Sequence, residues 1–181
     1  MISSNAKDSI DRIFRKAAQS RLPLDSSDAC EIVSLGHDFA DAMREPAGDV
    51  VVLTISSIEF RLLLVLHCGK DMPTRDYFTR GSGETPFEER ILEVGNLCCG
   101  AVNQELVRYF PDLGMSTPYA LSARSVPYLD ELRPGLLASY RVTINESVHL
   151  NATVCVCAHA PMDFTAEVTA EVESGGELEL F

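Results

Sequence analysis

Residues 86–109 carry the strongest secondary-structure signal in the chain, that of a long helix with one apolar side. The signal opens with Thr85, Pro86 and Glu88, which match a capping box with proline at the first helical position. At about 100° per residue, the apolar side chains lie within about 80° of Ile91. They are Phe87, Val94, Cys98, Ala101, Val102, Leu106 and Tyr109. The pattern predicts a helix that ends near Tyr109 and buries this stripe.

The opposite side of the same predicted helix is polar and contains poor helix formers. It comprises Glu89, Glu93, Asn96, Gly100 and Asn103. A glycine inside a helix costs roughly 1 kcal/mol against alanine, and Gly95 on the flank adds a further penalty. One physical reason for such a glycine is the close approach of another backbone. The alternative is an ordinary solvated face, which is the norm for surface helices.

The rest of the chain is predicted from its apolar spacing, its β-branched runs and its turn residues. We expect an amphipathic helix at 5–21. A second helix is expected from Asp28 as N-cap to about Met43, because Ile32 and Leu35 fit helical spacing. A short helix is expected at 72–79, and loops at 80–84 and 125–135. Strands are expected at 50–55, 58–67, 114–123, 136–144, 148–158 and 164–172.

This order of elements predicts an α+β fold, with an antiparallel or mixed sheet covered by helices, rather than an alternating α/β fold. We divide the chain into three parts. Residues 1–27 form an N-terminal helix and linker, residues 28–173 form the main domain, and residues 174–181 form an acidic, frayed tail.

Charge and composition exclude several classes of protein. The net charge of −12 disfavours binding to nucleic acid and to anionic membranes. The longest apolar run, 62–66, is far shorter than the roughly 20 residues that a membrane helix needs. The polar start lacks a signal peptide, and the six cysteines read as free thiols in a reducing compartment. We therefore expect a cytoplasmic protein.

The cysteines raise one alternative, a metal or redox protein. Cys155, Cys157 and His159 would point to one side of a strand. A zinc site would need a fourth ligand, such as His149 or the Cys98/Cys99 pair. Small thiols are more often packed in a core, so we predict no metal site.

The polar helix face also carries a motif. The run Glu93-Val94-Gly95-Asn96-Leu97-Cys98-Cys99-Gly100 fits E-x-x-N-x-x-x-G and resembles the signature helix of the CheC, CheX and FliY chemotaxis phosphatases. The family pattern begins with Asp or Ser four residues before the glutamate, where this chain has Glu89. The segment 113–118 resembles the strand that follows this helix in CheX-like proteins. A weak second copy at 31–34 has Ser34 in place of asparagine, so one intact motif favours the CheX-like branch.

The resemblance implies a fold and an activity. The fold would be CheX-like with an extra N-terminal helix. The protein would hydrolyse the aspartyl phosphate of a CheY-type response regulator. Glu93 would pair with the regulator's lysine, Asn96 would orient the attacking water, and Gly100 would allow close approach. Glu89 and Asn103 would complete the partner-binding face.

The resemblance also bears on cofactors and partners. The chain itself would bind no cofactor, because the regulator supplies Mg²⁺. A homodimer formed by joining two sheets would satisfy an exposed strand edge. The alternative is a non-catalytic adaptor of a signalling or flagellar switch complex, which would use the same helix to dock a partner without hydrolysis.

Overall fold

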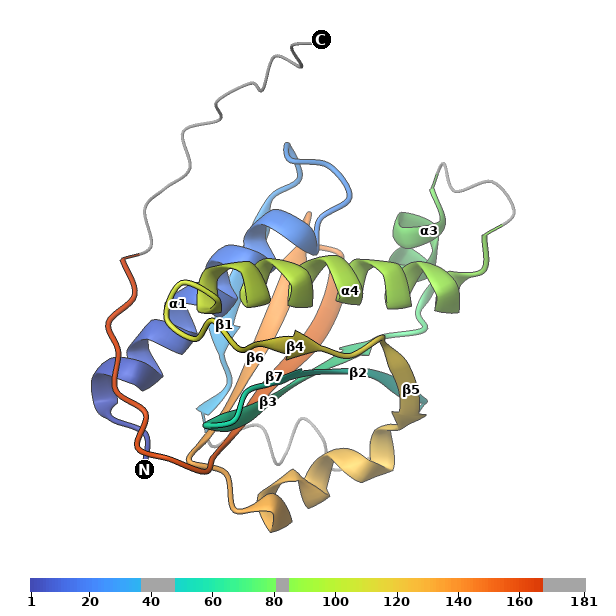
Figure 1. The fold of residues 1–181 in the computed structure, drawn as a ribbon. Helices are drawn as coiled ribbons and strands as arrows, with labels where there is room; N and C mark the ends of the chain where they lie inside the picture. The colour runs from blue at the N-terminus through green and yellow to red at the C-terminus, as the bar shows by residue number, and fades with distance from the viewer. Residues whose placement is uncertain (37–47, 81–84, 168–181) are drawn as a thin grey trace, which may run out of the picture.

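The computed structural model describes residues 1–36, 48–80 and 85–167, which form a seven-stranded sheet with helices on both faces (Figure 1). The strand order is β1-β6-β7-β3-β2-β4, and β5 also pairs with β2. Every pairing between these strands is antiparallel, which confirms the α+β class. The strands are β1 (Cys30–Ser34), β2 (Asp49–Ser56), β3 (Phe60–Cys68), β4 (Gly114–Met115), β5 (Tyr119–Ser122), β6 (Leu136–Ile144) and β7 (Val148–Ala158).

Among the described residues, α-helices cover one face of the sheet, and a 3₁₀ helix covers part of the other (Figure 1). The α-helices are α1 (Ser4–Arg21), α3 (Met72–Thr79) and α4 (Phe87–Leu106), and the 3₁₀ helix is η2 (Ala123–Leu132). The main core lies between the sheet and the layer of α1 and α4. A smaller cluster joins β2 and β3 to η2.

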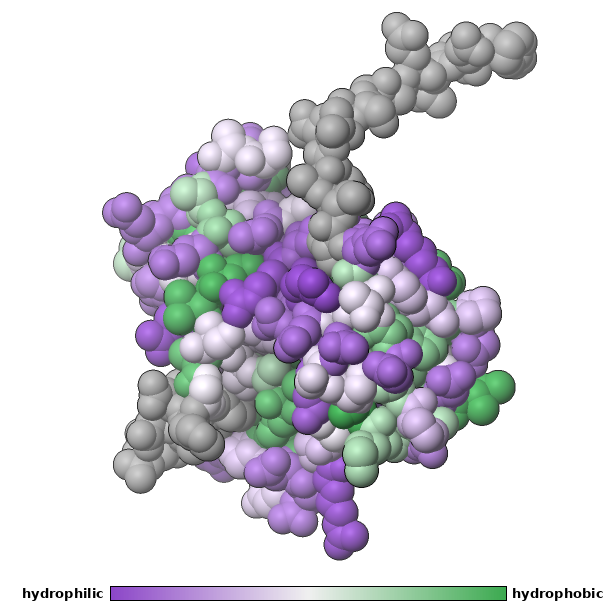
Figure 2. All heavy atoms as spheres, turned by 90° about the vertical axis from the view of Figure 1, so that its left-hand side faces the viewer, coloured by the Kyte–Doolittle hydropathy of each residue, from purple (hydrophilic) through white to green (hydrophobic). Residues whose placement is uncertain are grey.

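The N-terminal helix α1 is present as predicted. Its side chains Ile10, Ile13, Phe14 and Ala17 are buried in the main core. The ring of Phe14 packs 4.5 Å from that of Tyr140 on β6. The face of the molecule seen from the left of Figure 1 is mainly hydrophilic, with small apolar patches (Figure 2), so α1 buries one side and leaves the other to solvent.

The helix predicted to begin at Asp28 is wrong, because residues 30–34 form β1 and pair with β6. The carboxylate of Asp28 does not cap a helix. It accepts hydrogen bonds from the Tyr77 hydroxyl and the Asn145 amide, each at 2.6 Å. The weak second motif copy at 31–34 therefore lies on an edge strand. The remainder of the predicted helix, from residue 37, lies outside the described residues.

The capping box predicted for α4 is also wrong. Pro86 is extended (φ −60°, ψ 149°) and is itself the N-cap, without a side-chain hydrogen bond. The helix ends at Leu106 rather than Tyr109, because the N–H groups of Tyr109 and Phe110 both donate to the Leu106 carbonyl in a tight turn.

Most other predicted elements occur close to their expected bounds. The strands β2, β3, β6 and β7 and the helix α3 are confirmed. The strand predicted at 114–123 is divided into β4 and β5, and the predicted loop at 125–135 contains most of η2. The loop residues 81–84 and the tail 174–181 lie outside the described residues.

The last predicted strand, 164–172, is wrong where it is described. Residues 164–167 lie beside α1 without strand pairing. The Ala166 N–H donates to Ser9 Oγ at 2.9 Å, and the Phe164 ring packs 4.9 Å from that of Tyr109. These contacts with α1 and with the turn after α4 replace a sheet partner. Residues 168–172 lie outside the described residues.

Candidate functional site

Helix α4 buries its apolar stripe against the sheet as predicted. Phe87, Ile91, Val94, Cys98, Val102 and Leu106 are all buried. Gly95 is buried with them. A Cβ added at Gly95 would lie 3.3 Å from side-chain atoms of Leu66 and Val51 and 3.4 Å from Leu53. Gly95 therefore lets α4 pack closely on β2 and β3, a role that the motif does not indicate.

Gly100 has a different environment. A Cβ added there would meet no described atom within 4 Å. Packing inside the described part of the chain therefore gives no reason for a glycine at this position, although the helix carries its cost of about 1 kcal/mol.

The two glutamates of the polar face are exposed. Glu93 accepts an ion-paired hydrogen bond from Arg90 Nη1 at 2.6 Å, and the two side chains are 55% and 26% exposed. Exposed ion pairs are worth only about 0–1 kcal/mol. A cation from another molecule could therefore replace Arg90 as the partner of Glu93. Glu89 lies one turn earlier on the same side.

The two asparagines of this face are half-buried. The Asn96 side chain makes no hydrogen bond with any described residue. The Oδ1 atom of Asn103 is buried and has no described partner. Amide groups normally find partners when they lose solvent. The structure therefore places Glu93, Asn96, Gly100 and Asn103 together on one face, with both amides unpaired inside the described chain.

Beside Glu93 lies a pocket of about 350 Å³ that sequence reasoning missed. We call it the arginine pocket, because Arg21, Arg80 and Arg90 line it. Its other lining residues are Pro23, Leu24, Asp25, Glu93, Val94 and Leu97. The arginines come from the end of α1, the C-cap of α3 and the first turn of α4, so no local motif reveals them.

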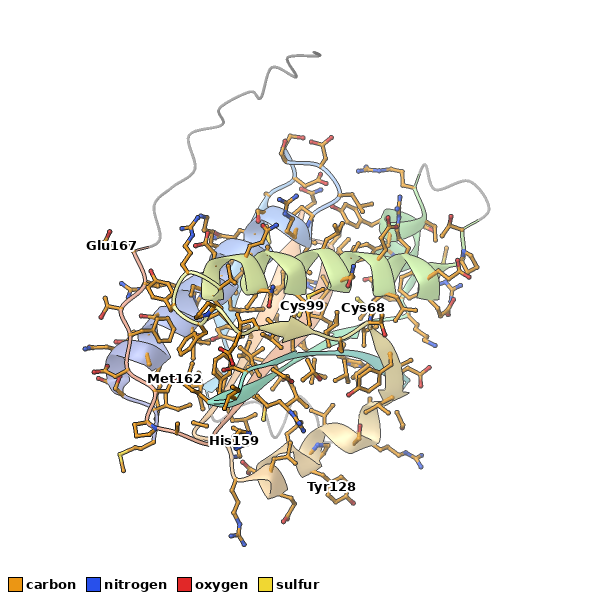
Figure 3. The ribbon with its side chains drawn as sticks, viewed as in Figure 1. Cys68, Cys99, Tyr128, His159, Met162 and Glu167 are labelled. Carbon is orange, nitrogen blue, oxygen red and sulfur yellow. The ribbon has the colours of Figure 1, made fainter. Side chains whose placement is uncertain are left out.

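The cysteine thiols of the core are buried, which makes them unreactive. Cys98 and Cys99 are fully buried, and burial raises the pKa of Cys99 to about 12. Figure 3 shows Cys68 and Cys99 in the layer between α4 and the sheet, whereas Tyr128 projects from η2 beyond the other face. Burial and the neighbouring Cys157 raise the pKa of Cys155 to about 12.

Residues 1–36, 48–80 and 85–167 hold no group of three or more His, Cys, Asp or Glu side chains arranged for a metal ion. Among those residues, each helix is too short or too polar to span a bilayer.

No family model matches the sequence, and no curated protein matches it in sequence. Solved structures do match the fold. The chemotaxis protein CheX from Vibrio vulnificus aligns with a TM-score of 0.58 at 12% identity, covering 82% of this chain and 99% of that one. A CheC-like superfamily protein from Shewanella sp. PV-4 aligns with a TM-score of 0.51 at 8% identity, covering 86% and 99%. The chain therefore has the fold of CheX and CheC-like proteins.

Proposed function

We propose that this chain, whose fold is that of CheX, is a phosphatase that hydrolyses the aspartyl phosphate of a CheY-type response regulator. The observation that carries the proposal is the polar face of α4. There Asn96 makes no hydrogen bond within the described chain and Gly100 has open space beyond its Cα. A partner backbone that approaches this face gives the glycine its physical reason.

Glu93 and Asn96 are suited to separate tasks. They are three residues apart on α4 and therefore neighbours on its surface. Glu93 would exchange its pair with Arg90 for the regulator's lysine and fix the register of docking. Asn96 would reach the acyl phosphate and hold a water in line with it. An amide both donates and accepts hydrogen bonds and carries no charge to repel the phosphate.

The proposed reaction needs few other groups from this chain. Phosphoryl transfer depends on positioning and on electrostatic stabilisation. The Mg²⁺ that supplies the latter would be bound by the regulator's own acidic residues. This chain contributes the placed water, and misplacement of a reacting group by about 1 Å can cost about 100-fold in rate. Neither Glu93 nor Asn96 acts as a nucleophile in this scheme.

The test is phosphate release from a phosphorylated CheY-type receiver domain of the source organism in the presence of Mg²⁺. Asn96→Ala should lower the rate by about 100-fold while retaining binding. Gln104→Ala is the matched control, because Gln104 is an exposed amide on the same helix but on the flank that faces α1. Hydrolysis by Asn96→Ala at the parent rate would refute the assigned role. Receiver binding without any change in phosphate lifetime would instead establish the non-catalytic adaptor.

We also propose that the chain forms a homodimer through the sheet edge at β4 and β5. All residues of both strands are exposed. The edge carries the apolar side chains Met115, Tyr119 and Leu121, which are 38–43% exposed. An exposed apolar edge is a template for pairing with another chain. Sedimentation should show a dimer that Leu121→Lys converts to a monomer, and a parent that sediments as a monomer at high concentration would refute this.

A further inference from the structure

We propose that the arginine pocket receives acidic side chains of the docked receiver domain, next to its phosphorylation site. The proposal rests on the proposed function, because the pocket shares Glu93 with the face that would meet the receiver. It adds a second contact area to the motif, built from elements that the motif does not include. The occupant is thus a carboxylate of the regulator rather than a small-molecule ligand.

The three guanidinium groups differ in how far they are already paired. Arg21 makes no ion pair or hydrogen bond with any described residue through its side chain. Arg80 is 63% exposed and lies 3.9 Å from Asp28. Arg90 pairs with Glu93, but its Nε atom is buried and has no described partner. The pocket therefore holds cationic hydrogen-bond donors that the described chain leaves unused.

The charge of the pocket is opposite to that of the whole chain. The protein carries a net charge of −12, whereas three arginines and two carboxylates, Asp25 and Glu93, line the pocket. A receiver domain with an acidic metal site would meet charge of its own sign on most of this chain's surface. A local positive area at the contact offsets this repulsion and selects one orientation. Arginine suits that task because its planar fork binds a carboxylate in two hydrogen bonds.

Docking would also exchange one ion pair for two. When the regulator's lysine takes Glu93, the partly buried Arg90 loses its carboxylate. A guanidinium left unpaired away from water is costly. A receiver carboxylate in the pocket would pair with Arg90 in place of Glu93. The pair between Arg90 and Glu93 is therefore the arrangement of the undocked chain.

The test measures binding of the full chain to a CheY-type receiver domain activated with beryllium fluoride and Mg²⁺. Arg21 is the best site to change, because its loss breaks no described hydrogen bond. Arg21→Gln should raise the Kd about threefold and Arg21→Glu about tenfold. Arg21→Lys should retain part of the parent's affinity. Arg124→Gln is the matched control, because Arg124 is an exposed arginine on η2, across the sheet from α4.

Two further readouts separate a binding role from a structural one. Unfolding by urea should give nearly the same midpoint for Arg21→Gln as for the parent, because loss of a cation from the last turn of α1 costs at most about 1 kcal/mol. The difference in Kd between parent and Arg21→Glu should shrink between about 50 mM and about 500 mM NaCl, because exposed charges are screened. A parent that hydrolyses the phosphate through Asn96, while Arg21→Glu binds as tightly as Arg124→Gln, would overturn the pocket proposal alone. A parent that neither binds nor dephosphorylates any receiver would overturn the proposed function, and the pocket proposal with it.

Discussion

Substitution of the two glycines of α4 by alanine should have different effects on stability. This contrast tests whether the polar face of α4 is uncovered. In Gly100→Ala the new methyl group meets no described atom within 4 Å, so only the helix propensity changes. Alanine is favoured over glycine inside a helix by about 1 kcal/mol. We therefore expect Gly100→Ala to raise the free energy of unfolding by about 1 kcal/mol.

Gly95→Ala gains the same propensity but places its methyl group 3.3 Å from Leu66 and Val51. Overpacking a core costs about 1–3 kcal/mol, which cancels the gain or exceeds it. The two variants should thus differ by about 1–3 kcal/mol, with Gly100→Ala the more stable. In a chain of 181 residues, each kcal/mol corresponds to a shift of about 2–4 °C in Tm.

Urea titration followed by far-ultraviolet circular dichroism measures this difference, since the chain has no tryptophan for a fluorescence assay. If Gly100→Ala is destabilised as much as Gly95→Ala, the polar face is packed within the chain and the reasoning fails.

The same two variants also test function. Gly100→Ala should dephosphorylate a receiver about tenfold more slowly despite its higher stability, because its methyl group fills space that the partner needs. A stable and fully active Gly100→Ala would establish an ordinary solvated face.

Three further predictions concern the packing around this site. Tyr77→Phe removes the hydroxyl that donates to Asp28 at 2.6 Å and should cost about 1–2 kcal/mol by urea titration at pH 7. This hydrogen bond is the main cause that lowers the pKa of Asp28, so its stabilisation is present above the usual carboxyl pKa near 4 and is lost as the pH falls through the lowered value. A difference between parent and Tyr77→Phe that stays constant down to about pH 2 would contradict this. Phe164→Ala should lower stability by about 1–3 kcal/mol, because its ring packs 4.9 Å from that of Tyr109, and an unchanged Tm would show that this segment is not docked. Cys99 should resist thiol reagents at pH 8 until urea unfolds the chain, because burial raises its pKa to about 12. Mass spectrometry that finds Cys99 labelled in the native protein would refute this.

The sequence predicts well those elements whose type is set by residues close together in the chain. Strands β6 and β7 begin and end at the predicted residues, because their β-branched runs are bounded by turn residues. Helix α1 is predicted by its apolar spacing. In α1 the buried side chains recur at helical spacing, and in all three elements neighbouring residues favour the same type of structure.

The wrong predictions share a physical cause, which is a partner distant in the sequence. Asp28 has the chemistry of an N-cap, but its carboxylate binds Tyr77 and Asn145, which are 49 and 117 residues away. Ile32 packs against the main core from strand β1, although its spacing to Leu35 also fits a helix. Short apolar segments carry both periods, so only the tertiary partner decides between them.

The candidate site divides in the same way. The polar face of α4 follows from helical geometry, so its five residues are predictable from the sequence. The role of Gly95 requires the position of α4 over β2 and β3, and the arginine pocket requires three separate elements to meet. What sequence reasoning finds here is therefore the part of the site that lies on one helix, and what it misses is the part that the fold assembles.

The net charge of −12 leads to a last prediction, on the salt dependence of receiver binding. Salt would weaken the attraction that we propose for the arginine pocket, and it would also screen the repulsion between this acidic chain and an acidic receiver. These two effects oppose each other, so affinity should change only modestly between about 50 mM and about 500 mM NaCl. Isothermal titration at several salt concentrations measures this dependence. A steep loss of affinity would indicate a basic partner recruited by the whole acidic surface, since no short-range pair between acidic proteins produces such a slope.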